Sequence, residues 1–470
     1  MNNYKEQPAH TNKDFLKKLW QLAIPISIQC MMFSLLGLID ILMVGQLGES
    51  AVAAVGLGNR IFFFNLILSA SLGGGLSILA AQYIGARDTS GVRRTLALSL
   101  AASILITIPF IIVYLLFTDA IIGFASSSPE LLSLGSDYLL ITAPSILCTA
   151  IVVPLEAALR ASNDATTPTR IGLLTILVNI ALNYIFIFGA FGIPAMGVAG
   201  SALGTALARL LQLVILCYCI LNFRTYLIPT ARDLSKAFRR TELKRYLKVS
   251  LPIIFQDGLW AFGVVLYHLI YGQMGVDELA IMSAVSAIEG LLISLFIGFA
   301  IGASIILGHE LGASQFDAAW KQGRLFLMGS PIIALLIGLI LILFNAHVIM
   351  LLGELREATI LAAKQVVIVA GMALCLRVIN LVGIVGVLRS GGDVNATALI
   401  NIIGMWCVGL PLAWLAATVW QLPLYLVFIC GLMEEVTKAV LVLHRIVTRR
   451  WLKNLVVSTP EKIPVQQESG

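Results

Sequence analysis

The chain has 470 residues, of which 59% are hydrophobic and only 12% are charged, and its mean hydropathy is +0.96. A soluble domain is nearer half apolar and a quarter charged, so this composition excludes a soluble globular protein and indicates a polytopic membrane protein. The formal net charge of +6 is interpreted as membrane topology and contact with anionic lipid, not as nucleic-acid binding.

Apolar stretches separated by short islands of charge predict an all-α chain of transmembrane helices. Most of the stretches are long enough to cross a bilayer core of roughly 30 Å as a helix. The first follows a polar N-terminus and is too long for the core of a signal peptide, so we expect it to stay in the membrane. In chain order, the twelve expected segments are 19–44, 52–83, 94–117, 136–160, 166–189, 194–222, 249–273, 279–308, 322–344, 361–388, 396–418 and 422–445.

Basic residues indicate the orientation, because Lys and Arg in short loops stay on the cytoplasmic side. The densest basic stretch, 224–248, lies between the sixth and seventh segments. We therefore expect a multi-pass protein of the bacterial inner membrane, monomeric and with both termini in the cytoplasm. The expected domains are an N-terminal tail (1–18), a six-helix lobe (19–222), a basic cytoplasmic linker (223–248), a second six-helix lobe (249–446) and a C-terminal tail (447–470).

Neither an enzyme nor a metal centre is expected. The five histidines are scattered along the chain, and all seven cysteines fall inside apolar segments without the spacing of metal ligands. No phosphate-binding loop of the G-x-x-x-x-G-K-[ST] type is present, so no cofactor is expected. Because the chain lacks such a nucleotide-binding loop, transport across the membrane would have to be driven by an ion gradient.

The two halves of the chain resemble each other. Residues 22–48, LAIPISIQCMMFSLLGLIDILMVGQLG, align without a gap to residues 249–275, VSLPIIFQDGLWAFGVVLYHLIYGQMG. At the same offset, GGGLSILAAQYIGA (73–86) matches AIGASIILGHELGA (300–313). Six helices in each half give both halves the same orientation, so we expect two lobes related by an axis along the membrane normal.

Several motifs together resemble the multidrug and toxic compound extrusion (MATE) family. They are DILMVGQLG (40–48), QYIGA (82–86), HELGA (309–313), LRASND (159–164), LRSGGD (388–393), and VNIALNYIFIFG (178–189) followed by GVAGSALGTALA (197–208). The resemblance covers nearly the whole chain. It implies a two-lobed antiporter that exports organic, often cationic, compounds in exchange for Na⁺ or H⁺.

The resemblance also implies a cation-coupling site in the N-terminal lobe, formed by Asp40, Asn179, Asn183 and Thr205. A carboxylate at mid-membrane costs about 2.5–3.5 kcal/mol on insertion scales, so Asp40 is expected to face a polar interior. The amide oxygens of Asn179 and Asn183 could join it around Na⁺ or support a protonated acid, and both ions stay open. Some family members carry a second acid at position 183, so a two-carboxylate relay is not expected here. The alternative for Asp40 is a structural hydrogen bond between helices.

Asp257, Glu289 and Arg377 are the candidates for cation or substrate binding in the C-terminal lobe. Asp257 could equally be a helix-start residue near the interface. Arg377 could neutralise Glu289 or Asp257 in one conformation only, or form a fixed ion pair. Two further pairs lie four residues apart, Glu156 with Arg160 and Glu434 with Lys438, and they are expected to be structural. The metal ion considered for this chain is a possible Na⁺ at Asp40.

One alternative function is a flippase of lipid-linked saccharides, which has a related two-lobed fold. Such a protein handles pyrophosphate and would be expected to line its cleft with several basic residues. Here Arg60, Arg209 and Arg377 are nearly the only basic residues well inside the segments, while acids prevail near the expected cavities. The sequence therefore favours a cationic or amphipathic cargo.

Overall fold

The computed structural model of the chain describes residues 12–125, 128–350 and 357–457, and all regular structure in these residues is helical. The start of the expected N-terminal tail and the end of the expected C-terminal tail lie outside them. The helices of the first half are α1 (Asn12–Gly45), α2 (Glu49–Gly85), α3 (Thr89–Leu116), the short α4 (Thr118–Ala125), α5 (Pro129–Ala161), α6 (Thr166–Phe188) and α7 (Gly197–Phe223).

The second half repeats this architecture with two interrupted helices. A single turn (η1, Thr225–Leu227) and α8 (Ala231–Ala237) connect the halves. Two π-helical segments, η2 (Val382–Leu388) and η4 (Ile402–Gly409), lie within the tenth and eleventh long helices and do not end them. The elements are α9 (Arg240–Met274), α10 (Val276–Gly312), α11 (Phe316–Leu343), α12 (Asn345–Met350), α13 (Glu357–Leu381) continued by η2 (Val382–Leu388) and η3 (Arg389–Gly391), α14 (Val394–Asn401) continued by η4 (Ile402–Gly409) and α15 (Leu410–Thr418), and α16 (Leu424–Val447).

Eleven helices in the described residues are long and apolar enough to cross a membrane. The twelfth long helix, α16, carries Glu434, Glu435 and Lys438 in its middle, which lowers its apolar character. These charges find partners inside the lobe, because Lys438 pairs with Glu434 and Asn380 donates to Glu435. The predicted fold class, twelve helices in two six-helix lobes, is confirmed.

Each expected segment falls on one of these long helices, with ends that differ by a few residues, and the largest difference is at α9. That helix begins at Arg240, inside the basic stretch expected to be a linker. It follows α8, whose start is fixed by a capping box in which Thr230 and Asp233 exchange hydrogen bonds. Tyr246 and Val249 are buried on one face of the early turns of α9, and this burial stabilises the polar start of the helix.

Close contacts between α2 and α10 display the internal repeat. A Cβ on Gly85 of α2 would collide with the backbone of His309, and a Cβ on Gly312 of α10 would collide with the backbone of Gln82. In the alignment of the two halves these are the same contact seen twice, because Gln82 matches His309 and Gly85 matches Gly312. The two lobes therefore meet through a pseudo-twofold pair of glycine contacts.

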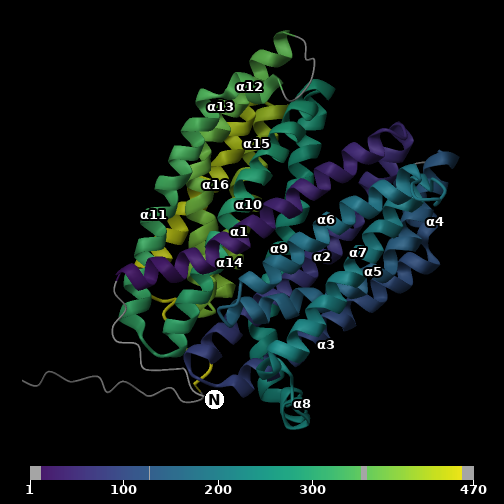
Figure 1. The fold of residues 1–470 in the computed structure, drawn as a ribbon. Helices are drawn as coiled ribbons and strands as arrows, with labels where there is room; N and C mark the ends of the chain where they lie inside the picture. Colours follow the sequence, from purple (N-terminus) through teal and green to yellow (C-terminus); the bar gives the residue numbers. More distant parts are fainter. Residues whose placement is uncertain (1–11, 126–127, 351–356, 458–470) are drawn as a thin grey trace, which may run out of the picture.

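The first helix of each half crosses to the opposite lobe. Leu22, Ala23 and Ile26 of α1 belong to the hydrophobic core built mainly by α10, α11, α13 and α16. Conversely, Tyr246 and Ile253 of α9 belong to the core built by α2, α3, α5 and α7. Figure 1 shows α1 (purple) running obliquely from one lobe to the other.

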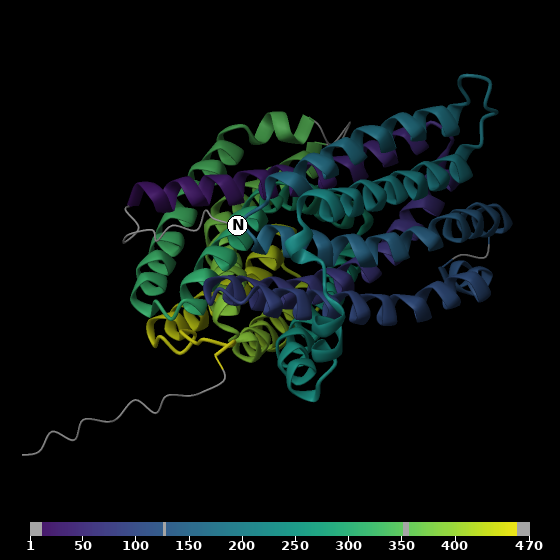
Figure 2. The same cartoon turned by 60° about the horizontal axis from the view of Figure 1, so that its bottom comes forward.

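The lobes join at the end of the molecule that carries α8, called the base below. Figure 1 shows their helices converging at this end and diverging towards the other, and Figure 2 shows the yellow C-terminal segment lying across the base. Gln82 of α2 donates to the carbonyl oxygens of Ser390 (2.8 Å) and Lys453 (3.2 Å), and its Oε1 accepts from the backbone nitrogen of Leu455 (2.6 Å). Polar bonds thus hold the lobes together at the base.

Candidate cation site and the polar clusters of the two lobes

A chain of hydrogen bonds connects the four residues predicted for the N-terminal lobe. Nδ2 of Asn183 donates to Oδ1 of Asp40 at 2.8 Å and to Oδ1 of Asn179 at 3.3 Å. Nδ2 of Asn179 in turn donates to the hydroxyl of Thr205 at 3.3 Å. The chain runs from α1 through α6 to α7, so three helices contribute to one polar site.

Local packing explains why α6 and α7 can share this site. Asn179 and Asn183 lie four residues apart on α6 and therefore face the same direction. On α7 the facing positions are small: a Cβ on Gly200 would collide with the backbone of Phe186, and a Cβ on Gly204 with Oδ1 of Asn183. Glycine at these positions brings the two helices close enough for the amide groups to reach Thr205.

Asp40 belongs to no ion pair among the described residues. The positive charge of Arg209 acts on Asp40 without forming an ion pair with it. The Arg209 side chain instead donates to Gln212 at 2.9 Å and lies 5.1 Å above the ring of Phe33. The Oδ1 of Asn183 is buried and accepts no hydrogen bond within the described part of the chain. The site therefore offers a carboxylate and an amide oxygen that a small cation could use, since hard cations prefer oxygen ligands.

In the C-terminal lobe, Glu289 and Arg377 face each other. Nη1 of Arg377 donates to Oε2 of Glu289 at 2.7 Å, and the guanidinium lies 5.8 Å from the ring centre of Phe428. The Oε1 of Glu289 and the Nε of Arg377 are both buried without a partner in the described residues. This ion pair keeps one unused oxygen and one unused donor.

Asp257 does not join that pair. Its Oδ1 accepts from Arg389 at 2.7 Å and its Oδ2 accepts from the hydroxyl of Ser71 at 2.8 Å. Ser71 lies on α2 of the first half, whereas Arg389 follows η2 of the second. Asp257 is therefore a bridge between lobes, and of the two acids that Arg377 was considered to neutralise, only Glu289 is its partner here.

A second polar cluster was not predicted as a unit. The hydroxyl of Tyr267 donates to Oε2 of Glu434 at 2.7 Å, and Lys438 pairs with Oε1 of the same carboxylate. Nδ2 of Asn380 donates to the neighbouring Glu435 at 2.6 Å. The alignment of the two halves could have indicated this cluster, because Tyr267 is the counterpart of Asp40 and lies at the equivalent position in the other lobe.

The pair of Glu156 and Arg160 on α5 is present as predicted and is part of a network. Nε2 of Gln29 and Nε2 of Gln212 each donate to Oε1 of Glu156 at 3.1 Å. Glu156 is therefore satisfied from α1, α5 and α7 together. Among the described residues no group of three His, Cys, Asp or Glu side chains could hold a metal ion.

The arrangement defines a class of protein: a two-lobed polytopic membrane transporter with polar and charged clusters inside its helices. The chain belongs to the multidrug and toxic compound extrusion family, because the family profile described as MatE matches residues 25–185 and 252–415. Members of this family are transporters and not enzymes, and the family is one of multidrug efflux.

Curated relatives and solved structures agree with this assignment. The chain is 28% identical over 423 residues to the probable multidrug resistance protein NorM of Oceanobacillus iheyensis, covering 87% of this chain and 91% of that one. It is 26% identical over 418 residues to the multidrug resistance protein NorM of Vibrio cholerae, covering 86% and 87%. A multidrug resistance MATE family transporter solved in an outward-facing conformation has the same fold, with a TM-score of 0.83, 23% identity and coverage of 92% and 96%.

Proposed function

We propose that this chain is a secondary antiporter that exports organic cationic or amphipathic compounds in exchange for Na⁺ or H⁺. The observation that carries the proposal is Asp40, an acid inside the membrane that accepts a hydrogen bond from the amide of Asn183 and forms no ion pair with a basic side chain of the described residues. A cation entering the site would compensate its charge. No cofactor is required by this proposal, and the protein would act as a monomer.

Alternating access is supported by how the lobes meet. The inter-lobe hydrogen bonds of Gln82 lie at the base, where the basic stretch 224–248 favours the cytoplasmic side. The lobes diverge at the opposite end (Figure 1), so this shape corresponds to a carrier closed towards the cytoplasm. Both termini would then be cytoplasmic, in a bacterial inner membrane.

Energy coupling requires that the ion and the cargo prefer different shapes, because a ligand with equal affinity for both shifts nothing. In this proposal the ion binds Asp40 from outside and favours the return of the lobes, and the cargo favours the opposite change. The membrane potential adds about 2.3 kcal/mol per charge per 100 mV for an inward-moving cation. The Glu289–Arg377 pair is proposed to contact cation or substrate when the pair opens.

The flippase alternative is less well supported, because three of the basic groups inside the helices are already paired with carboxylates. Arg377 pairs with Glu289, and Arg389 pairs with Asp257. Lys438 likewise pairs with a glutamate of its own helix. A pyrophosphate would have to compete with these carboxylates, whereas a cationic cargo would not.

The test is dye efflux from everted vesicles, under an imposed Na⁺ gradient and separately under an imposed pH gradient. Asp40→Asn keeps the shape of the side chain and removes its charge, so coupled efflux should be lost under the gradient that drives the native protein. Asp137→Asn, which changes an exposed acid on α5, is the matched control and should transport normally. Undiminished efflux by a folded Asp40→Asn variant would remove Asp40 from the mechanism.

A further inference from the structure

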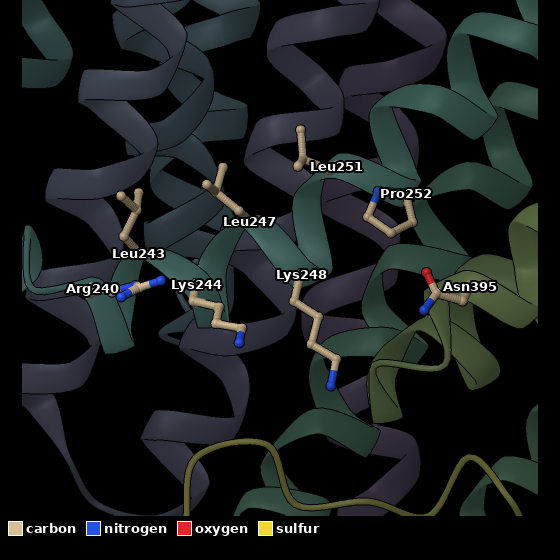
Figure 3. A pocket seen from close by; sticks show the side chains of 8 residues that line it. All are labelled: Arg240, Leu243, Lys244, Leu247, Lys248, Leu251, Pro252 and Asn395. Atoms are coloured by element: carbon tan, nitrogen blue, oxygen red, sulfur yellow. The ribbon is translucent and has the colours of Figure 1, made fainter.

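A shallow groove of about 490 Å³ opens beside the first turns of α9, outside the polar sites of the two lobes. Its wall is formed by α9 on one side and by the start of α14 on the other (Figure 3). It is lined by Arg240, Leu243, Lys244, Leu247, Lys248, Leu251, Pro252 and Asn395.

The lining separates charge from apolar surface. Arg240, Lys244 and Lys248 recur every four residues and so share one face of α9, and Leu247 and Leu251 follow the same period on the adjacent face. Figure 3 shows the leucines pointing to one side of the groove and the amino groups of the two lysines pointing to the other. The groove is therefore cationic along one edge and aliphatic along the other.

The three groove cations, Arg240, Lys244 and Lys248, are not neutralised by the protein. All three are exposed, and none of them forms an ion pair with a carboxylate of the described residues. Two other basic residues of this region, Arg93 and Arg245, do have acidic partners. Arg245 pairs with Glu242 at 3.3 Å within the same helix. The groove thus carries three uncompensated positive charges on one face of a single helix.

Arg93, a basic residue close to the groove, has the acidic partner that the groove cations lack, namely Asp233. Burial alone would raise the pKa of Asp233, but hydrogen bonds from Ser90, Thr230 and Arg93 outweigh it and hold this pKa well below its usual range. Asp233 therefore stays ionised and compensates Arg93 at 2.6 Å. No such acid faces the groove.

The position of the groove relative to the membrane selects an occupant. The exposed side chains of Leu251 (54%) and Phe255 (58%) continue the aliphatic edge along α9, away from the base and into the membrane-spanning part. Lysine and arginine at helix ends extend their charged ends towards the membrane interface. The groove therefore presents cations at headgroup depth and hydrocarbon directly below them.

We propose that this groove binds an anionic phospholipid of the cytoplasmic leaflet. The phosphate and the acidic headgroup would lie between Lys244, Lys248 and Arg240, with the amide of Asn395 as a further hydrogen-bonding group. One acyl chain would follow Leu247 and Leu251. A soluble anion would use only the cationic edge, whereas a phospholipid uses both edges, and charge complementarity excludes a cationic partner.

The experiment measures lipid binding to the full-length protein in a neutral detergent, by the shift of its melting midpoint and by native mass spectrometry. The probes are dioctanoyl phosphatidylglycerol, dioctanoyl phosphatidylcholine and glycerol phosphate. The test variant is Arg240→Gln with Lys244→Gln and Lys248→Gln. The matched control is Arg232→Gln with Lys321→Gln and Arg324→Gln, which removes three exposed cations elsewhere on the basic side.

Phosphatidylglycerol should bind the native protein and the control variant alike and should bind the groove variant about 100-fold more weakly, since each cation near the surface adds about 1 kcal/mol. Leu251→Gln should weaken binding of the lipid without changing the response to glycerol phosphate. Equal affinity of phosphatidylglycerol for the groove and control variants would overturn the proposal. Glycerol phosphate binding as tightly as the lipid would also overturn it, in favour of a soluble anion.

Discussion

Nδ2 of Asn183 lies 2.8 Å from Oδ1 of Asp40, and this hydrogen bond joins the first helix of the chain to α6. Asn183 is completely buried, so the donor of this bond is shielded from bulk water, whereas Asp40 is only partly buried. A hydrogen bond to a charged group is worth about 1.5–3 kcal/mol, which makes Asn183 the residue best placed to tune how Asp40 binds a cation.

Replacing Asn183 by Ala should change the ion dependence of efflux by about tenfold or more. If Na⁺ is the coupling ion, its half-saturating concentration should rise, because the carboxylate loses the group that orients it. If H⁺ is the coupling ion, the pH midpoint of efflux should move to higher pH, because the donor no longer favours the charged carboxylate. Asn65→Ala, a buried asparagine of α2 that bonds Thr107, is the control. An unchanged ion dependence under both gradients would separate Asn183 from coupling.

Gly204→Ala should disturb the same site without touching a charged residue. A Cβ at this position would collide with Oδ1 of Asn183 and lie 3.1 Å from its backbone nitrogen, so the amide must leave the position from which it donates to Asp40. We expect coupled efflux to fall at least as far as in the Asn183 variant, with the protein still inserted. Gly56→Ala introduces the same methyl group into open space and should transport normally. Normal efflux by Gly204→Ala would mean that the α6–α7 contact can give way at no cost.

The grouping of Asp40 with Asn179, Asn183 and Thr205 could be predicted from the sequence through the family resemblance, and the spacing of the two asparagines on one helix face agrees with it. The pair of Glu156 and Arg160 could be predicted from its spacing, since both residues share a helix. The partner of Asp257 could not be predicted in this way. Its contact with Arg389 depends on how α9 and the end of η2 are rotated against each other, and no sequence period records that angle.

Tyr267 illustrates the same limit. The repeat alignment identified it as the counterpart of Asp40, but its bond to Glu434 crosses from α9 to α16. Many polar residues of the C-terminal half could have been its partner by sequence alone. The early start of α9 was missed for a different reason: the turns that begin at Arg240 are polar, and a search for apolar segments does not detect an amphipathic extension beyond the membrane.

Gln82→Ala should open the base of the molecule. The side chain of Gln82 makes three hydrogen bonds across the lobe junction, to Ser390, Lys453 and Leu455. Each is worth about 0.5–1.5 kcal/mol, so their loss should increase the population open at the base by at least about tenfold. Spin labels at the starts of α3 and α11, near Thr89 and Phe316 at the base, would report the longer distance. Gln322→Ala removes a buried glutamine that bonds only within its own lobe and should leave the distances unchanged.

Lys438→Met should destabilise the C-terminal lobe, because it leaves Glu434 buried without its cation. Both side chains are nearly inaccessible, with 5% and 8% of their surfaces exposed. Removing one partner of a buried pair costs about 3–5 kcal/mol, whereas replacing both by apolar groups is often neutral. The melting midpoint in detergent should therefore fall in Lys438→Met and recover in the double variant with Glu434→Leu. A double variant as unstable as the single one would show that Glu434 is needed by Tyr267 as much as by Lys438.

Asp393 provides a pH-dependent clamp on the C-terminal segment, outside the membrane-spanning helices. Its two oxygens accept from Arg445 at 2.6 and 2.9 Å, and Lys453 lies 3.3 Å away. Burial alone would raise the pKa of Asp393, but the hydrogen bonds from Arg445 and the charge of Lys453 outweigh it and hold the pKa below its ordinary value. A group whose pKa is lower in the folded protein stabilises the fold above its unfolded pKa, which is about 3.9 for Asp.

This stabilisation should be present at neutral pH and lost as the pH falls below about 4, towards the lower pKa of the folded protein. Asp393→Asn should melt several degrees lower than the native protein at pH 7, and the gap should narrow on acidification because the native carboxyl then becomes neutral as well. Asp137→Asn, an exposed acid on α5, should follow the native curve throughout. Because Lys453 belongs to the segment that also bonds Gln82, protonation of Asp393 should release this segment to added protease before the lobes unfold. A constant gap between native protein and Asp393→Asn from pH 7 to pH 3 would mean that the carboxylate charge does not hold the segment.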